Sequence, residues 1–427
     1  MNNVELDRKY IWHPFTQMKI QAEILPVKRA AGSRIYLEDG SELLDCISSW
    51  WVNVHGHAHP HIAARIGRQA AELEHVIFAG FTHAPATELA SRLVPQLPGA
   101  MAKIFFSDNG STSVEVALKM AVQFFSNHGK KKTRILAFEN AYHGDTFGAM
   151  SVGGRSTFNT PFEDMFFEVD FLPLPQVGDD TALQRLENYL EQHEYAAFIY
   201  EPLVQGSAGM VIYDAAGLNE ILARCREKNI LLIADEVFTG FGRTGTLFAS
   251  QQLAVKPDMM CISKGLTGGF LPMGITACTQ QIFDAFYSDD KMKALYHGHS
   301  YTANPIACAA ACASLDLFED PSCFKNIQRI ATAHQQFALQ ITGKVAVRSV
   351  KVCGTILSIE LETGDQSGYF HSLRDKIYYY FIKKGLLMRP LGNVIYVLPP
   401  YCFSDEELKT VYTAIDELVN QPLINLL

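Results

Sequence analysis

The chain has 427 residues, 48% of them hydrophobic and 19% charged, which excludes a disordered or fibrous protein and leaves ample material for a large core. Its formal net charge of −9 at pH 7 argues against nucleic acid or an anionic membrane as a partner. No apolar run is long enough to span a membrane, and because Glu5 and Asp7 precede no apolar stretch we expect no secretory signal.

The order of apolar runs predicts an α/β fold. Arg34–Leu37 and the turn at Asp39-Gly40 predict strands near the N-terminus. Short apolar runs then alternate with helical patterns from about residue 50 to 315, which predicts a mostly parallel sheet covered on both faces. The expected strands are Ile104–Phe106, Ile135–Phe138, Ala197–Tyr200, Ile230–Ala234 and Met259–Ile262, with a helix from about Thr112 to Phe125 after the first.

The last hundred residues predict a smaller α+β unit that the N-terminal strands join. It has an amphipathic stretch near Cys323–Leu339, strand-like runs at Ile356–Leu361 and Val394–Leu398, and a final helix. We therefore divide the chain into residues 1–49 (N-terminal part of a small domain), 50–318 (large domain) and 319–427 (C-terminal part of the small domain). The nine cysteines include no C-x-x-C pair, and their odd number favours reduced thiols in a cytoplasmic protein.

Asp235 and Lys264 each close an apolar strand, and this pair is the most informative feature of the sequence. Ligands of parallel sheets collect at the carboxyl ends of the strands, so both side chains should meet in one site. An amine that can bond to an aldehyde and a carboxylate that can hold a pyridine nitrogen protonated are what pyridoxal phosphate (PLP) requires. Burial would lower the pKa of such a lysine. The alternatives are a surface position for Lys264, and a helix cap or half of a salt bridge for Asp235.

Two further motifs follow expected strands. In Asn109-Gly110-Ser111-Thr112, Thr112 and Glu115 fit a capping box, Gly110 permits close backbone approach, and the helix start with Ser111 would hold a phosphate. The alternative is an ordinary helix cap. In the second motif, residues 140–145, Tyr142 would stack on a planar cofactor, the alternative being a packed tyrosine in a turn, while Asp145 is undecided.

Two motifs suggest other functions. Gly240–Gly245 matches G-x-G-x-x-G, but no clear helix start follows, so a nicotinamide-binding oxidoreductase ranks below the PLP interpretation. The four histidines of residues 55–61 suggest a metal, yet they lack the accompanying Cys or carboxylate ligands, and we expect a loop that packs and caps, with no metal.

Residues for substrate binding are harder to select. Trp50 and Trp51 adjoin the histidine run and would either seal a core or line a channel for an alkyl chain. Arg389 precedes Pro390 and would either bind a substrate carboxylate or form a surface salt bridge.

Taken together, the motifs resemble the class III aminotransferases of PLP fold type I. The resemblance rests on Ala234–Val237, Gly242–Gly245, Pro257-Asp258 and Ser263–Gly265. One branch, which acts in biotin synthesis, is indicated by motifs that extend across nearly the whole chain: Trp12–Thr16, Ser48–Trp51, Thr82–Ala86, Tyr142–Thr146, Arg389–Gly392 and Val397–Pro400.

The resemblance implies a homodimer that converts 7-keto-8-aminopelargonate to 7,8-diaminopelargonate by a ping-pong route, with S-adenosylmethionine or lysine as amino donor. Another class III transaminase for ω-amino acids or diamines is the alternative. It implies catalytic roles for Lys264, Asp235 and Tyr142. It implies phosphate contacts from Gly110 and Ser111, and from His299 and Ser300 of the second subunit. It implies substrate contacts from Phe15, Trp50, Trp51, Tyr142, Lys264, Gly298 and Arg389. Phe15 stands where this branch often has Tyr, and Ser300 where it often has Thr.

Overall fold

The structure is a computed structural model that describes residues 1–20, 23–364 and 371–420. Its largest sheet has seven strands in the order β4-β12-β11-β10-β7-β5-β6. They are β4 (Met101–Ser107), β5 (Arg134–Phe138), β6 (Val169–Leu172), β7 (Tyr195–Tyr200), β10 (Leu231–Asp235), β11 (Met259–Ile262) and β12 (Gly274–Thr279). The expected mostly parallel sheet is confirmed, with one reversal: β12 runs antiparallel to β11 and β4. The connection over residues 263–273 is shorter than the dozen or more residues that a parallel crossover needs.

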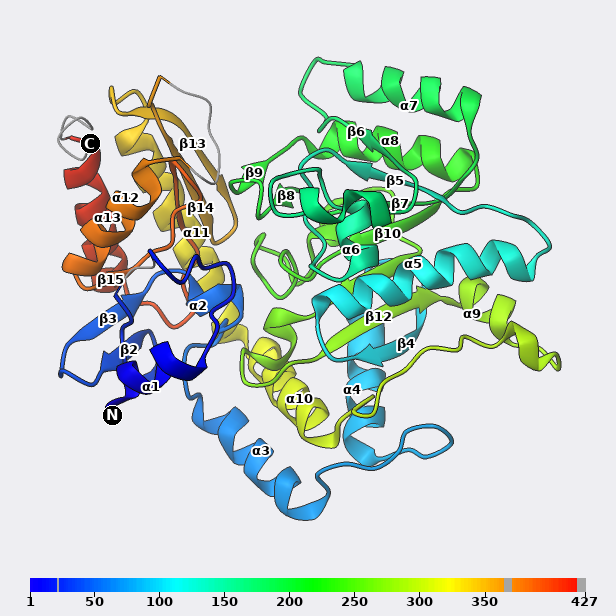
Figure 1. Ribbon diagram of the computed structural model, residues 1–427, viewed down its shortest axis with the longest axis horizontal. Coiled ribbons are helices and arrows are strands. Elements are labelled where there is room, and N and C mark those ends of the chain that lie inside the picture. The colour runs from blue at the N-terminus through cyan, green and yellow to red at the C-terminus, as the bar shows by residue number, and fades with distance from the viewer. Residues whose placement is uncertain (21–22, 365–370, 421–427) are drawn as a thin grey trace.

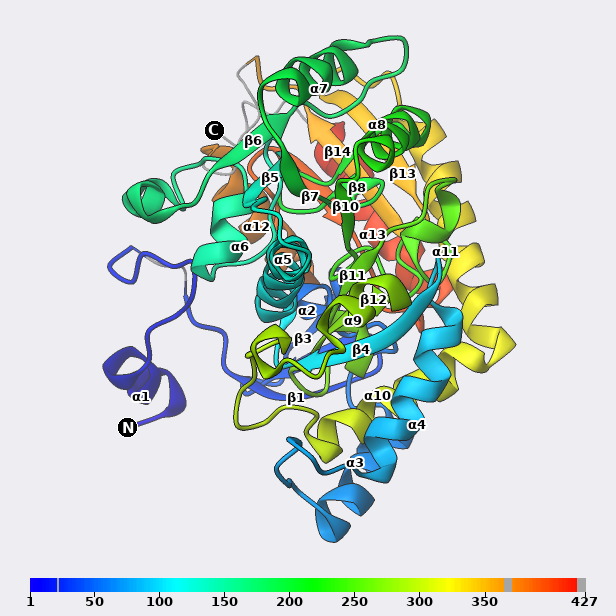
Figure 2. The ribbon, with the colours of Figure 1, turned by 90° about the vertical axis from the view of Figure 1, so that its right-hand side faces the viewer.

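Helices cover both faces of this sheet, as the apolar strands predict (Figure 2). Leu231 and Ile233 pack toward α5, whereas Leu232 and Ala234 pack on the opposite side, because side chains alternate along a strand. On the α5 side lie α5 (Gly110–Asn127), α6 (Phe147–Val152) and α9 (Gln280–Phe286). On the other side lie α4 (Ala84–Leu93), α7 (Thr181–Gln192), α8 (Ala215–Glu227) and α10 (Pro305–Glu319), with α3 (Pro60–Glu72) against α10.

Segments from the N-terminal and C-terminal parts of the chain lie together beside the large sheet (Figure 1). β1 (Val27–Ala31), β2 (Arg34–Leu37) and β3 (Glu42–Asp45) form a sheet with β15 (Leu386–Leu387), which pairs parallel to β3. A second sheet holds β13 (Val347–Cys353), β14 (Ile356–Leu361) and β16 (Val394–Val397). The helices here are α11 (Pro321–Ile341), α12 (Leu373–Lys383) and α13 (Asp405–Val419). The remaining short elements are α1 (Asn3–Tyr10), α2 (Ser48–Trp51), β8 (Val204–Gln205) and β9 (Val211–Ile212).

The runs expected in the C-terminal part are confirmed as α11, β14, β16 and α13, whereas β13 and α12 are additional elements. Pairing of β15 with β3 also confirms that the N-terminal strands join C-terminal ones. Among the residues described, no helix is both long enough and apolar enough to cross a membrane. All nine cysteines are free thiols.

Candidate active site

A cavity of about 450 Å³ opens at the carboxyl ends of β5, β7, β10 and β11. Such volumes suit small ligands, and this edge of a parallel sheet is where ligands bind. The side chains around it that carry chemistry are Ser111, Tyr142, His143, Glu201, Ser207, Asp235 and Lys264. The sequence-predicted Asp235, Lys264, Tyr142, Gly110, Ser111 and Trp51 are therefore all brought to one cavity.

Asp235 is the last residue of β10 and is almost completely buried. Its Oδ1 accepts the backbone N–H of Val237 at 3.0 Å, and its Oδ2 lies 2.7 Å from Nδ1 of the buried His143. The other ring nitrogen of His143, Nε2, is buried without a partner. A carboxylate held on two sides, in a cavity, can carry negative charge toward a cationic ligand nitrogen.

Lys264 follows β11, the strand next to β10. Its backbone has a φ of 44°, a conformation that turns the chain sharply at the strand end. Burial lowers the pKa of its amine to about 8, although the carboxylates of Asp235 and Glu201 act in the opposite direction. Its Nζ lies 4.8 Å from the centre of the Trp51 ring. The amine is therefore enclosed and has an appreciable unprotonated fraction near neutral pH, as a nucleophile or base needs.

Glu201 is a second buried carboxylate in the cavity wall, directly after β7. Its Oε1 accepts the backbone N–H of Tyr142 at 3.1 Å and its Oε2 accepts that of Gly206 at 3.0 Å. Burial raises the pKa of Glu201 to about 7 against the influence of His143, and Asp235 raises it further. This side chain ties the Tyr142 loop to the strand β8.

Tyr142 lines the cavity and its hydroxyl donates to Oδ2 of Asp145 at 2.9 Å. Burial, together with Asp145, raises the pKa of the Tyr142 hydroxyl, which therefore stays protonated. Asp145 does not line the cavity itself but orients the ring that does.

The start of α5 differs from the prediction. The helix begins at Gly110, not Thr112, and its cap is Asn109, which forms a capping box with Thr112. Glu115 instead accepts the backbone N–H groups of Gly148 and Ala149. The predicted capping box of Thr112 and Glu115 is therefore wrong, because Asn109 is the stronger cap and lies one turn earlier. Gly110 and Ser111 now occupy the first helical positions, where backbone N–H groups have no helical acceptor and can bind an anion.

A second group of expected residues lies outside the cavity lining. The Arg389 guanidinium sits 4.7 Å from the Trp50 ring centre, and the ring of Phe15 lies 5.6 Å from that of Trp50. Among the residues described, no carboxylate pairs with Arg389, so the salt-bridge alternative is not supported. This cationic and aromatic surface comes from three distant parts of the chain.

Gly298, His299 and Ser300 do not line the cavity of their own chain. They lie in the connection before α10, where the backbone N–H of His299 donates to Thr302 and that of Tyr301 to the His299 ring. Tyr296 and Tyr301 on either side are largely exposed.

The two competing motifs have other structural uses. No helix begins at Gly240–Gly245, and Arg243 is buried, donating to the carbonyl oxygens of Pro399 (2.9 Å) and Trp51 (3.1 Å). A dinucleotide site needs a helix start there, so the nicotinamide interpretation is wrong.

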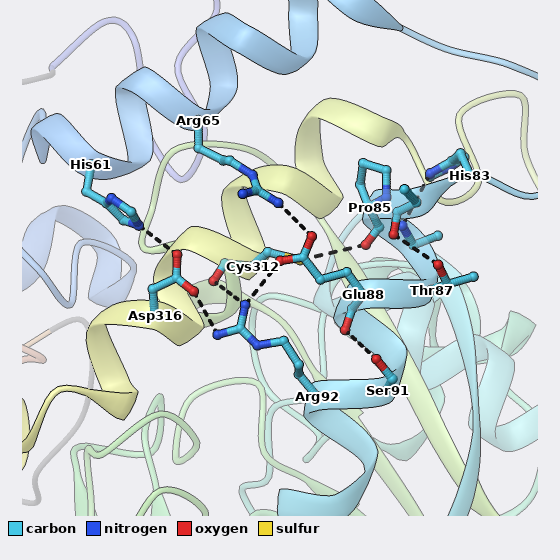
Figure 3. Close-up of polar contacts among 12 residues, drawn as sticks. His61, Arg65, His83, Pro85, Thr87, Glu88, Ser91, Arg92, Cys312 and Asp316 are labelled. Carbon is cyan, nitrogen blue, oxygen red and sulfur yellow. Dashed lines mark hydrogen bonds and ion pairs between the residues drawn. The ribbon is translucent and has the colours of Figure 1, made fainter.

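The histidines of residues 55–61 point to separate partners. His55 contacts Ser314, and His57 contacts Asp45. His61 contacts Asp316 in a separate polar network between α3, α4 and α10 (Figure 3). Within the part of the chain that the structure describes, no cluster of His, Cys, Asp or Glu could hold a metal ion.

Sequence reasoning missed Glu201, Ser207 and the partnership of His143 with Asp235. A signal for Glu201 exists, because it follows an expected strand directly, as Asp235 does. No comparable signal marks Ser207, which lies in a connection between short strands.

Comparisons with known proteins identify the family of a chain that has an enclosed lysine and a buried aspartate on neighbouring strands. The family model "Aminotransferase class-III" matches residues 16–419, and the chain belongs to this family. Its fold is that of PLP fold type I, shared with the transaminases of the solved structures below.

Among curated relatives, the chain is 49% identical over 421 residues to the adenosylmethionine-8-amino-7-oxononanoate aminotransferase of Synechococcus elongatus, covering 96% of this chain and 99% of that protein. The enzyme of the same name from Geobacter sulfurreducens is 38% identical, with 97% and 96% covered. The solved structure of that aminotransferase from Methanocaldococcus jannaschii superposes with a TM-score of 0.91 at 35% identity, covering 97% and 98%. An amine transaminase from an uncultivated Pseudomonas species, in its PLP-bound form, gives 0.88 at 30% identity, covering 95% and 97%.

Proposed function

We propose that this chain is a PLP-dependent aminotransferase that converts 8-amino-7-oxononanoate (7-keto-8-aminopelargonate) to 7,8-diaminononanoate in biotin biosynthesis. The observation that carries the proposal is the convergence of Lys264 and Asp235 on one cavity at the carboxyl edge of the sheet. Full-length relatives named for this reaction support the choice of substrate.

The residues present fit the cofactor. A buried amine with a pKa of about 8 faces the same cavity as a buried carboxylate and a helix start. Lys264 would hold the cofactor covalently, Asp235 its ring nitrogen, Tyr142 one ring face, and Gly110 with Ser111 its phosphate. When bound, PLP supplies an aldehyde that takes up the amino group and a ring that stabilises negative charge on the adjacent carbon.

The chain's own residues handle protons and position. Lys264 Nζ would act as the base that removes the proton from the donor's α-carbon, and would return a proton in the second half-reaction. Asp235, oriented by His143 and the Val237 N–H, keeps negative charge beside the ring nitrogen so that this nitrogen stays protonated. Trp51, with Phe238, excludes water around the amine, which lies 4.8 and 5.9 Å from their ring centres.

Substrate recognition falls to the surface formed by Phe15, Trp50 and Arg389. The guanidinium, without a carboxylate partner among the described residues, is available to the carboxylate of the keto acid. The aromatic rings suit its alkyl chain. S-adenosylmethionine is the proposed amino donor, supported by the names of the relatives.

The decisive test mixes purified protein with each donor alone and follows cofactor colour. S-adenosylmethionine should bleach the yellow colour and, with the keto acid added, give the diamine. Bleaching by lysine instead would change the donor, for which Phe15 in place of a tyrosine hydroxyl leaves room. Bleaching by simple amines together with no diamine from the keto acid would favour an ω-transaminase, the name of several structural relatives.

We further propose a homodimer in which His299 and Ser300 complete the phosphate site of the second subunit, with Gly298 near its substrate. Support comes from their position outside their own cavity and from the exposed Tyr296 and Tyr301 beside them. Mixing subunits tests this. Lys264→Ala protein and Ser300→Ala/His299→Ala protein, each inactive alone, should regain activity when refolded together. If each dimer site used only its own chain, no activity would return.

The division into residues 1–49, 50–318 and 319–427 is likewise proposed, supported by the pairing of β15 with β3. We propose a cytoplasmic location, which the nine free thiols support because reducing compartments keep thiols unpaired.

A further inference from the structure

Two of the chain's three tryptophans lie on one strained turn. Ser48, Ser49 and Trp51, within α2, have φ values of 50°, 58° and 69°, in the region that favours glycine. Ser49 combines its φ with a ψ of −88°, outside the left-handed helical region as well. A residue other than glycine keeps such a backbone conformation only where surrounding contacts hold it.

The carboxylate of Asp45 binds the middle of this turn. Asp45 is 0% exposed, and its Oδ2 accepts the backbone N–H of Ser49 at 2.6 Å and the Ser49 hydroxyl at 3.1 Å. Its Oδ1 accepts the backbone N–H of Ile47 at 3.3 Å. Nε2 of His57 lies 2.8 Å from the same Oδ2. The buried Asp45 carboxylate is thus fully engaged within the turn. Asp45 itself does not line the cavity, whereas Trp51 at the end of the turn does.

The turn decides where both indoles lie. The Trp51 indole N–H donates to the Tyr396 hydroxyl at 3.1 Å, and the ring stands beside the Lys264 amine. Trp50 faces outward to the Arg389 guanidinium and to Phe15. The neighbouring bonds hold only the ends of the turn: Ser48 Oγ donates to Leu398, and Arg243 donates to Trp51.

We propose that Asp45, held by His57, is a positioning residue for substrate recognition: it fixes the Ser48–Trp51 turn in the strained form that sets Trp50 beside Arg389. This assigns a use to one histidine of the residue 55–61 run. The identity of the substrate rests on the proposed function, whereas the effect on the turn does not.

The test is Asp45→Asn, which keeps the size of the side chain but places an N–H donor against the donors of Ser49 or His57. We expect the KM for the keto acid to rise about tenfold, with kcat changed by less than about threefold. In a Trp12→Phe background, Trp50 and Trp51 are the only tryptophans. Their fluorescence should shift to the red and be quenched more strongly by acrylamide, in protein with or without cofactor.

The matched control is Asp316→Asn. It removes a similar contact, with Oδ2 of Asp316 2.7 Å from Nε2 of His61, at a place outside the cavity lining (Figure 3). Both readouts should match the parent protein in this control. Unchanged fluorescence and unchanged KM in Asp45→Asn would overturn the proposal.

A second variant protects the test against misfolding. If Asp45→Asn does not fold, His57→Ala leaves the carboxylate in place without its imidazole partner, and we expect the same changes at smaller size. Parent-like fluorescence and KM in His57→Ala would then count against the proposal. If the parent protein fails to use the keto acid while the fluorescence responds as expected, the proposed substrate is wrong and the assignment of Asp45 to the turn stands.

Discussion

The proposed active site combines two groups of residues, called here its two walls, that are positioned in different ways. One wall consists of side chains at the carboxyl ends of adjacent strands: Tyr142 after β5, Glu201 after β7, Asp235 on β10 and Lys264 after β11. The other consists of Phe15, Trp50 and Arg389, which lie outside the large sheet and come from distant parts of the chain. Trp50 and Arg389 lie side by side because β15 pairs parallel with β3, which brings the segment before Arg389 next to the segment before Trp50.

The difference between the two walls suggests that the first carries out the chemistry and the second recognises the substrate. The first wall lies at the edge of the large core, and burial there raises the pKa of Glu201 and lowers the pKa of Lys264. The second is half-exposed and carries its cation beside aromatic rings. If this separation is real, substitutions in the first wall lower kcat and those in the second raise KM.

The largest effect is expected from Lys264→Ala. Removing the amine removes both the covalent attachment point and the base, so turnover should fall by at least about a thousandfold. Cofactor should still bind, but without the absorbance of the covalently attached form. The measurement is steady-state transamination with absorbance spectra of the purified protein.

Lys256→Ala is the matched control, because the Lys256 amine only donates to backbone carbonyls such as those of Ser250 and Gln251. It should keep its turnover. Turnover of Lys264→Ala close to that of the parent would exclude Lys264 from the chemistry.

Asp235→Asn should have the next largest effect. Asparagine keeps the shape but removes the charge that holds the ring nitrogen protonated, so kcat should fall about 100-fold or more while KM changes little. Asp258→Asn is the control, since that partly buried carboxyl lies at the opposite end of the same strands and accepts from the backbone of Leu232. Equal losses in both variants would mean that Asp235 acts only on stability.

The first wall could be predicted from sequence, and the second only in part. Asp235 and Lys264 were found because apolar runs mark buried strands and parallel strands share one functional edge. Glu201 also follows a buried strand directly. It was missed because no second motif in the sequence suggests a function for that carboxylate, as Lys264 does for Asp235. The reversal of β12 also follows from a countable property, the short connection over residues 263–273.

The second wall depends on contacts between residues far apart in the chain. Nothing local in the sequence near Trp50 indicates that Arg389 will lie 4.7 Å from its ring. Reasoning from the residues left Trp50 and Arg389 with two alternatives each, and only the resemblance to a family assigned both to substrate binding. The positive φ angles of Ser48, Ser49 and Trp51 also could not be predicted, since serine and tryptophan rarely adopt them and nothing in the sequence indicates them. Local physical rules thus identify the chemistry of this protein more readily than its specificity.

Arg389→Lys tests the second wall. Lysine keeps the charge but loses the planar fork that binds a carboxylate through two hydrogen bonds. The KM for the keto acid should rise about 10- to 100-fold, and kcat at saturation should change little. The matched control is Arg348→Lys, since Arg348 pairs with Glu360 and Glu362 on a different sheet. A loss confined to kcat would mean that Arg389 acts in the chemical step, and would contradict the separation of chemistry from substrate recognition.

The smallest expected effect concerns Glu201 and the pH dependence of stability. Burial raises the pKa of this carboxyl from 4.5 to about 7, so the folded protein holds a proton there that the unfolded chain releases. The resulting stabilisation is complete below about pH 4.5 and is lost as pH rises through about 7. Glu201→Gln cannot titrate, so its free energy of unfolding should fall less than that of the parent protein between pH 5 and pH 8. Urea unfolding at both pH values measures the difference, in which the contributions of the other titrating groups cancel.

Because glutamine must turn its amide donor toward either Tyr142 or Gly206, the variant should also be less stable at pH 5, by about 1–3 kcal/mol. An identical pH dependence in the two proteins would mean that the Glu201 carboxylate is already ionised in the fold, and that the first wall carries two negative charges beside Lys264.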